Sequence, residues 1–213
     1  MKENMIDEFE IKINTEFGKN LTYKKDGELD ITGDYLELTM LPVDIQLKKY
    51  EDEESGKEGE LIAGIYGYYM DMDYIYDQNI SLFESFDWYS GELYDLYEVL
   101  FEDGEYKEEF DVLFNPNLFY VSEIYVNEKY INEDYTTMLI NKLDEILRYI
   151  AKLNVGVIAT ELHESKIMDN IDRIEELSEK EKQESPSELK NILINNGYVI
   201  ASANNNYLVK VLN

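Results

Sequence analysis

The chain has 213 residues, of which 44% are hydrophobic and 13% aromatic, a length and composition typical of one folded domain. Its 47 acids outnumber 19 bases, so the formal net charge is −28. This sign argues against direct binding to nucleic acid or to anionic membranes, because both need clustered Lys and Arg. The chain has no cysteine for disulfides or thiolate sites, and no signal peptide or long apolar segment, so we expect a cytoplasmic protein.

Alternation of apolar and polar residues predicts strands in the first third of the chain. The segments with this period are residues 8–16, 35–50 and 61–77. Pro42 suggests a break or bulge in the second segment, and Gly64 and Gly67 would allow twist or close approach in the third. The spacing of the last two segments predicts a long antiparallel hairpin.

From Ser81 onward the apolar period becomes helical. The apolar positions are Leu82, Phe86, Leu93, Leu96, Val99 and Leu100. They predict one or two helices broken near Gly91, within an acidic, aromatic helical insertion over residues 81–111. After Gly91, acids recur at three- and four-residue steps, which places them on one exposed side. These acids are Glu92, Asp95, Glu98 and Glu102.

The second half of the chain alternates strand and helix patterns. The expected elements are a strand over 118–126, a helix over 135–153, a strand over 155–162, an inserted helix over 167–182 (within 165–184) and a final helix over 186–196. On the 135–153 helix, Leu139, Leu143, Ile146 and Ile150 form one apolar stripe. Ser185-Pro186-Ser187-Glu188 is a capping box, Gly197 fits a left-handed stop, and Asn204-Asn205-Asn206 indicates a closing hairpin. The fold class is therefore α+β, a mixed and mostly antiparallel sheet with helices on both faces.

Negative charge and aromatic residues gather in the same third of the chain. Residues 58–128 hold 18 acids and one base, Lys107, together with 18 aromatic residues that include the only tryptophan, Trp88. Acidic tails that stay disordered are poor in aromatic residues, so this segment should fold with its rings packed and its carboxylates in water. Two interpretations remain: a solvated acidic face, or a surface built to meet a basic partner.

The order of elements from residue 115 to 213 resembles the GNAT (Gcn5-related N-acetyltransferase) fold. LFYVSEIYVNEKYINEDYTTMLINKLDEIL looks like the central strand, pyrophosphate loop and following helix of that family, and ELKNILINNGYVIASANNNYLVKV looks like its final helix and hairpin. The resemblance implies one GNAT-like domain over 1–213, with the helical stretch 81–102 and the helix 167–182 as insertions.

The loop that holds the coenzyme A pyrophosphate in that family reads Arg/Gln-x-x-Gly-x-Gly/Ala. The aligned residues here are Ile131, Asn132, Glu133, Asp134, Tyr135 and Thr136, followed by Thr137. The glycines that let a backbone approach the phosphates are absent, and Glu133 and Asp134 add negative charge at that place. Asp134 would also compete for the helix amides as a cap. We expect no orthodox acetyl-CoA site and no cofactor.

The catalytic positions that the resemblance implies also differ. Many family members carry a tyrosine acid five residues before the aromatic residue of the final turn, and counting back from Tyr198 gives Leu193, which cannot donate a proton. Glu123 lies on the strand where some acetyltransferases carry their base. It is the one surviving catalytic candidate, beside the simpler interpretation as an inward or edge carboxylate.

No metal site is expected. His163 is the single histidine of the chain, and the default interpretation is a partly exposed loop residue. Asp71, Asp73 and Asp77 match a calcium loop only in spacing, because the sixth and twelfth positions from Asp71 are Tyr76 and Leu82 instead of glycine and glutamate.

Two functions follow as hypotheses. The first is a noncatalytic, inhibitory binding protein whose helical carboxylates, about 5–6 Å apart, mimic backbone phosphates toward a basic, nucleic-acid-binding protein. The expected contact residues are Glu84, Asp87, Trp88, Glu92, Asp95, Glu98 and Glu102. Residue usage heavy in Lys, Asn, Ile, Tyr and Glu hints at an AT-rich genome, which a phage or mobile element would fit. The alternative is a divergent N-acyltransferase that takes acetyl-CoA and a cationic amine drawn in by the acidic field.

Overall fold

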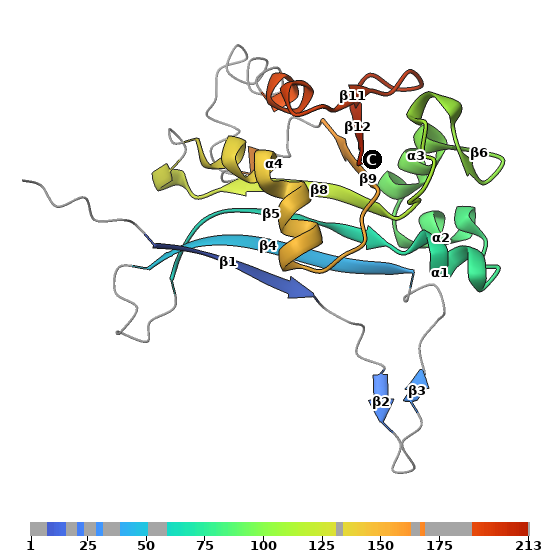
Figure 1. The fold of residues 1–213 in the computed structure, drawn as a ribbon, viewed down its shortest axis with the longest axis horizontal. Helices are drawn as coiled ribbons and strands as arrows, with labels where there is room; N and C mark the ends of the chain where they lie inside the picture. The colour runs from blue at the N-terminus through green and yellow to red at the C-terminus, as the bar shows by residue number, and fades with distance from the viewer. Residues whose placement is uncertain are drawn as a thin grey trace, which may run out of the picture.

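The computed structural model describes residues 8–15, 21–23, 29–31, 39–50, 59–130, 134–162, 167–168 and 189–212. Its centre is an eight-stranded sheet (Figure 1). In spatial order the strands are β1 (Glu8–Thr15), β4 (Met40–Tyr50), β5 (Glu60–Met70), β8 (Leu118–Val126), β9 (Val157–Glu161), β12 (Tyr207–Val211) and β11 (Val199–Ile200), with β10 (Ile167–Met168) also paired to β8. Strand β8 pairs in parallel with β9 and β10, and the other pairs of the sheet are antiparallel, which confirms the predicted mixed, mostly antiparallel sheet.

The remaining elements are short hairpins and helices. The hairpins pair β2 (Leu21–Tyr23) with β3 (Leu29–Ile31) and β6 (Phe101–Glu102) with β7 (Glu105–Tyr106). The helices are α1 (Met72–Asp77), α2 (Leu82–Tyr89), α3 (Gly91–Leu100), the 3-10 turns η3 (Glu108–Phe110) and η4 (Glu128–Tyr130), α4 (Tyr135–Glu145), the π-helical turn η5 (Ile146–Ile150), and a last helix described over 189–195.

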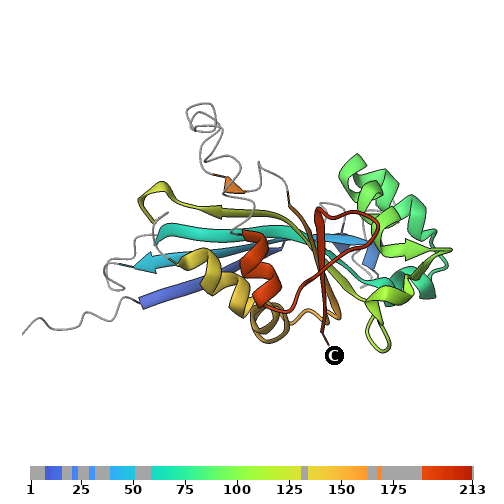
Figure 2. The ribbon, with the colours of Figure 1, turned by 90° about the horizontal axis from the view of Figure 1, so that it is seen from above.

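Helices cover both faces of the sheet, as the sequence predicted. Alternate residues of one strand point to opposite faces, so Phe119 and Val121 enter one core while Leu118 and Tyr120 enter the other. The first core, here the α4 core, receives α4, η5 and the 189–195 helix. The second, here the α3 core, receives α1, α2 and α3. Figures 1 and 2 show the two groups of helices on opposite sides of the central strands.

The N-terminal strands agree with the predicted alternation, with two corrections. The bulge of the β4–β5 pair lies at Leu47/Lys48, where Ile62 of β5 is the extra residue, and not at Pro42, which pairs regularly with Tyr68. The strand predicted over 61–77 ends at Met70, because Asp71 accepts a hydrogen bond from the backbone N–H of Tyr74 at 2.9 Å and starts α1.

The helix predicted over 135–153 is shorter and changes its winding. The backbone N–H of Ala151 donates to the carbonyl of Ile146, a five-residue step that defines the π turn η5. The extra residue per turn rotates the apolar stripe, so Leu147 is fully buried and Ile150 is 51% exposed. The prediction that Ile150 faces the core was wrong for this reason.

The last predicted elements are partly confirmed. At Ile167–Met168 the structure has a short strand where a helix was predicted, and residues 169–188, including the predicted capping box, lie outside the described residues. Gly197 ends the final helix with a φ of +86°, a left-handed conformation that glycine adopts without strain. The closing hairpin forms as β11 and β12.

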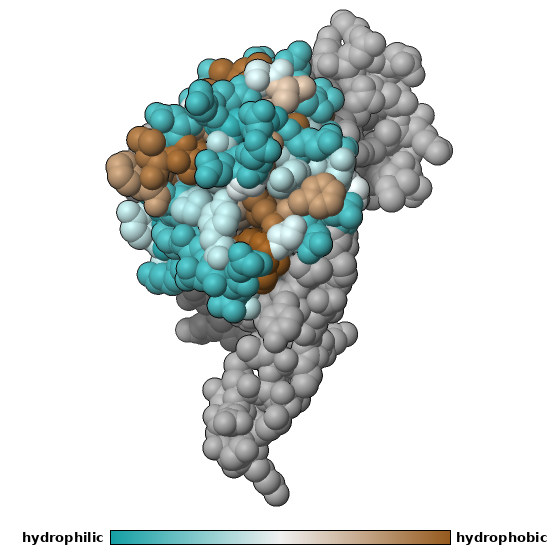
Figure 3. Space-filling view, turned by 90° about the vertical axis from the view of Figure 1, so that its right-hand side faces the viewer, coloured by the Kyte–Doolittle hydropathy of each residue, from teal (hydrophilic) through white to brown (hydrophobic). Residues whose placement is uncertain are grey.

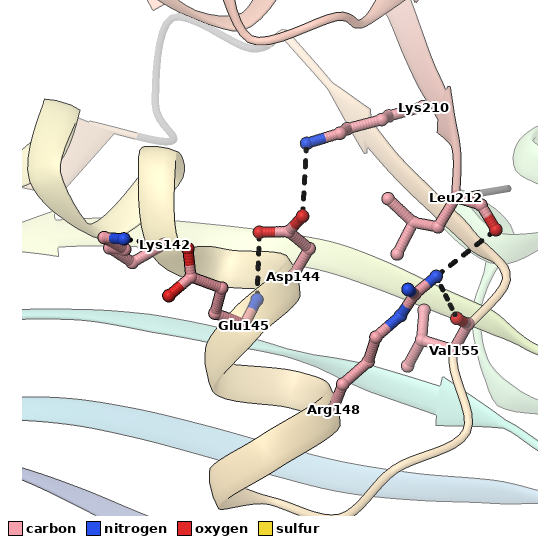
Figure 4. Close-up of polar contacts among 7 residues, drawn as sticks. All are labelled: Lys142, Asp144, Glu145, Arg148, Val155, Lys210 and Leu212. Atoms are coloured by element: carbon pink, nitrogen blue, oxygen red, sulfur yellow. Dashed lines mark hydrogen bonds and ion pairs between the residues drawn. The ribbon is translucent and has the colours of Figure 1, made fainter.

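Polar contacts attach α4 and η5 to the C-terminal strand (Figure 4). The Arg148 guanidinium donates to the carbonyls of Val155, at 3.4 Å, and Leu212, at 3.2 Å. Lys210 of β12 lies 3.9 Å from the Asp144 carboxylate, and its ammonium is 5.8 Å from the centroid of the Tyr198 ring. On the α4 side of the sheet, the bases Arg148 and Lys210 therefore make contacts within the chain.

Strands β5 and β8 approach so closely at Gly67 that a side chain cannot fit. A Cβ atom at this position would overlap the backbone carbonyl oxygen of Tyr120, beside the bulge at Tyr66/Gly67. We predict that Gly67→Ala lowers the free energy of unfolding by about 1–3 kcal/mol, because strand backbone must shift. Gly91→Ala is the matched control: a Cβ there meets nothing within 4 Å, so stability should stay equal or rise by up to about 1 kcal/mol. Urea denaturation of the two variants measures both, and equal midpoints would contradict this account of the close approach.

Candidate acidic interaction surface

One end of the molecule carries a dense layer of exposed carboxylates, which we call the acidic surface. Its members lie on α1, α2, α3, the β6–β7 hairpin and the loop around η3, and all are exposed. They are Asp73, Asp77, Glu84, Asp87, Asp95, Glu98, Glu102, Asp103, Glu105, Glu108, Glu109 and Asp111. Figure 3 looks at this end of the molecule and shows a mainly hydrophilic surface with small apolar areas.

A packed aromatic layer supports the acidic surface from below. Phe86 lies in the α3 core and meets the rings of Tyr97 and Phe101 edge to face, with centroids 5.8 and 5.6 Å apart. Phe101 in turn contacts Tyr106 of the hairpin at 4.4 Å. Such ring pairs add to the burial of apolar area. The prediction that rings are packed and carboxylates face water is confirmed for these residues.

Local capping sets where the two central helices start. The hydroxyl of Ser81 accepts from the backbone N–H of Glu84, and the hydroxyl of Ser90 accepts from that of Leu93, each at 3.3 Å. Ser90 interrupts the helical pattern between α2 and α3, which confirms the predicted break near Gly91.

The predicted contact residues do not all share one environment. Glu84 and Asp87 are exposed on α2, and Asp95 and Glu98 are exposed on α3, as predicted. Glu98 also accepts a hydrogen bond from the Tyr94 hydroxyl at 2.8 Å. Trp88 belongs to α2, and its side chain lies outside the described residues.

Two of the predicted acids need correction. Glu102 is exposed, but it lies in β6 and not on the helix, because α3 ends at Leu100. Glu92 is only half exposed, since its carboxylate accepts a 2.5 Å hydrogen bond from the buried hydroxyl of Tyr120 on the sheet. The four acids after Gly91 therefore do not form one exposed helical row.

The contact between Glu92 and Tyr120 belongs to a polar cluster that sequence analysis missed. Tyr207 and Glu161 are neighbours in the β12–β9 register and are both buried. Burial, followed by the hydrogen bond to Glu92, raises the pKa of Tyr120. Burial and the charge of Glu161 raise the pKa of Tyr207, whose hydroxyl has no well-formed hydrogen bond among the described residues. Sequence analysis missed this pair because the contact between Glu161 and Tyr207 depends on the register of β9 and β12.

The loop compared with a pyrophosphate site lies at the start of α4. Residues 131–133, which include Asn132 and Glu133, lie outside the described residues. Asp134 is exposed and makes no capping hydrogen bond with its side chain, so the expectation that it caps the helix was wrong. Tyr135, Thr136 and Thr137 are half-buried in the first turn of α4.

The candidate catalytic positions are placed as follows. Glu123 is half-buried on β8, opposite Tyr66, and faces away from the α4 core. Leu193 is buried within the α4 core. Strand β8 pairs with β9 only from Leu118 to Val121, and further along β8 the neighbour is β10, at Ile124 and Tyr125.

Two of the three acids with calcium-loop spacing have structural partners. Asp71 caps α1, and Asp73 accepts a hydrogen bond from the Asn117 side chain at 3.2 Å. No group of three His, Asp or Glu side chains suited to a metal occurs among the described residues, and His163 lies outside them. Within the same part of the chain, no helix is long and apolar enough to cross a membrane.

Comparisons with protein-family models, with curated proteins and with solved structures give no match for this chain. The resemblance to acetyltransferases therefore stays a prediction.

The buried tyrosines should make the folded state lose stability at high pH. Burial, and then the charges of Asp71 and Asp73, raise the pKa of Tyr69 to about 12, and burial raises the pKa of Tyr120, Tyr198 and Tyr207 as well. These phenols stabilise the fold fully below their unfolded pKa of about 10, and that contribution falls as pH rises through the folded values.

We predict that phenolate absorbance develops in two steps. Phenols that are neither buried nor hydrogen-bonded to a carboxylate ionise near pH 10, and the buried group should ionise together with loss of circular dichroism near or above pH 12. A single reversible step near pH 10 for all 19 tyrosines would contradict the buried arrangement.

Proposed function

We propose that this chain is a noncatalytic, inhibitory binding protein, and that its acidic surface docks on a basic protein of the nucleic-acid-binding class. The observation that carries the proposal is the separation of charge. Residues 59–127 contain 16 acids and one base, Lys107, whose ammonium donates to the backbone carbonyl of Glu98. The described residues from 129 to 212 contain six bases and four acids.

The intramolecular hydrogen bonds to acids of the acidic surface come from neutral groups, Asn117 to Asp73, Tyr94 to Glu98 and Ser202 to Glu109, so the negative charge stays available to a partner. The ion pairs seen among the described residues, Lys129–Glu60, Lys142–Glu145 and Lys210–Asp144, all lie outside the acidic surface. Like charges one helical turn apart destabilise a helix by about 0.2–0.5 kcal/mol per pair. A basic partner would relieve this repulsion and replace the mobile counterions, so binding should be fast and sensitive to salt.

The acidic surface has a stable frame, which distinguishes it from a disordered acidic tail. Leu93, Leu96 and Leu100 on the inner side of α3 are buried, while Asp95 and Glu98 on its outer side are exposed. A rigid array of charges presents one geometry to the partner and loses little conformational entropy on binding. This supports a decoy that takes the place of nucleic acid in the binding groove of a protein, more than a surface that only keeps the chain soluble.

The charge hypothesis predicts a position-specific effect. Asp87 and Asp95 both lie near the Tyr94 hydroxyl on the acidic surface. The double variant Asp87→Asn/Asp95→Asn should weaken partner binding about threefold to tenfold at low salt and leave the fold intact, because exposed charges contribute modestly and locally. The control Asp134→Asn/Glu145→Gln removes the same charge at the two ends of α4, where both acids are exposed and Glu145 pairs with Lys142.

The measurement is displacement from DNA. Basic DNA-binding proteins are loaded on DNA–cellulose, and the column is developed at constant low salt with wild type, with the double variant or with the control. Wild type and control should release the same DNA-binding proteins at similar concentrations. A higher concentration of the Asp87/Asp95 variant should be required for the same release. Release of nothing would refute the proposed partner class, and equal release by all three chains would refute the acidic surface as the site of contact.

A divergent N-acyltransferase remains the second candidate, favoured by Glu123, which lies on β8 two residues past the last β8–β9 pair at Val121. We expect calorimetric titration with acetyl-CoA to show no binding in the low micromolar range, because Asp134 places a negative charge at the start of α4. The variant Asp134→Gly/Thr136→Gly should raise donor affinity if the scaffold once used this loop. Tight binding by the wild-type chain would favour the enzyme over the decoy.

A further inference from the structure

Two large apolar side chains protrude beside the acidic surface. Phe114 is 90% exposed and Leu113 is 66% exposed, although 41 hydrophobic residues of the described chain are buried. Single exposed apolar residues are common, but an almost fully exposed phenylalanine next to an exposed leucine leaves a contiguous apolar tip in water. We call these two residues the apolar tip.

The loop that carries the apolar tip is held at both ends. Before the tip, Phe110 is buried in the α3 core. After it, the Asn115 side chain donates to the carbonyl and side-chain oxygens of Asn154, at 3.3 and 3.0 Å, and the Tyr106 hydroxyl donates to the carbonyl of Pro116 at 2.9 Å.

The same loop also packs closely against the irregular segment that precedes β9. A Cβ atom on Gly156 would overlap the backbone of Asn115. The backbone N–H of Asn117 donates to the Asn115 side chain at 3.1 Å. The base of the loop is therefore built into the sheet, and the tip is presented by that base.

Acids of the acidic surface stand directly beside the apolar tip. Asp111, Glu108 and Glu109 are exposed on the segment that leads into it. Glu109 is held by the backbone N–H and hydroxyl of Ser202, at 3.2 and 2.8 Å. Figure 3 shows apolar areas bordered by hydrophilic surface on this end of the molecule.

We propose that Leu113 and Phe114 form the apolar anchor of the acidic surface and insert into an apolar pocket flanked by Lys and Arg on the basic partner protein. This inference rests on the proposed function and adds the residues that set how long the partner stays bound. Charged contacts mainly set association rate, whereas an aromatic side chain desolvated in a pocket mainly sets dissociation. The held loop lowers the entropy lost when the anchor binds.

The negative charge around the apolar tip determines which class of partner can bind there. A second copy bound through the same surface would bring two acidic surfaces together, and nucleic acid or anionic lipid would be repelled by the acids around the tip. A basic protein is the partner that complements both the charge and the apolar tip. Self-association through the tip is therefore a test outcome and not the proposal.

The test uses two synthetic helical peptides of equal positive charge as probes. One has leucine and phenylalanine between its lysines, and the other has serine at those positions. Dye-labelled peptides are titrated by fluorescence anisotropy with wild type, Phe114→Ala, Leu113→Ala and the control Tyr149→Ala, which removes a ring that is 69% exposed at the end of η5.

Wild type should bind the apolar peptide about tenfold more tightly than the serine peptide, and Phe114→Ala should remove most of that difference. The serine peptide should bind all four chains equally and lose affinity with salt. The control should behave as wild type. Because Phe114 is nearly fully exposed, its replacement leaves the core untouched, and circular dichroism should match wild type.

The outcomes separate this inference from the proposed function. If both peptides bind with equal, salt-sensitive affinity to every chain, the acidic surface stands and the anchor is refuted. If neither peptide binds at low salt, the proposed function itself fails. If sedimentation shows a wild-type dimer that Phe114→Ala abolishes, the occupant is a second copy and the proposal is overturned. Equal losses in Phe114→Ala and Tyr149→Ala would also refute a specific anchor.

Discussion

The burial of the central strands on both faces is the constraint on which the rest of this structure depends. Val157 and Ala159 of β9 enter the α3 core, and Ile158 between them enters the α4 core. Strand β12 divides in the same way, with Leu208 on one side and Tyr207 and Val209 on the other. Because neither face can meet water, helices must cover both. The α1–α3 group is the cover of one face, so its outer side is the acidic surface.

Tyrosine takes part of the role that bases usually have as partners of carboxylates, once on the acidic surface and three times elsewhere among the described residues. Phenol hydroxyls donate to carboxylates in four places: Tyr94 to Glu98, Tyr120 to Glu92, Tyr125 to Asp44 and Tyr130 to Glu60. A hydrogen bond to an ionised acceptor is stronger than one between neutral groups. The ring packs against its neighbours while the hydroxyl satisfies the carboxylate, and the negative charge is not cancelled.

The sequence predicted most elements whose signal is local. Apolar runs located β8 and β9, and glycines located the break between α2 and α3 and the end of the final helix. The errors have non-local or subtle causes. The π turn that exposes Ile150 follows from one extra residue within a good helical pattern, and Glu92 is drawn inward by Tyr120, 28 residues away. The exposure of Phe114 depends on how Asn115 and Pro116 are held by distant residues.

The groups that accompany the carboxylates differ between the α4 side and the α3 side of the molecule. On the α4 side, Lys142 and Lys210 lie beside Glu145 and Asp144, so positive and negative charges largely offset each other. On the α3 side, Glu98 is held by Tyr94, and the pKa of that phenol is raised by the same hydrogen bond, which keeps it a neutral donor. A lysine in place of the tyrosine would also donate to the carboxylate, but its positive charge would offset the negative charge of that carboxylate. A frame that orders carboxylates and retains their charge is what a basic partner can recognise, and it accounts for high tyrosine and low lysine content in the same segment.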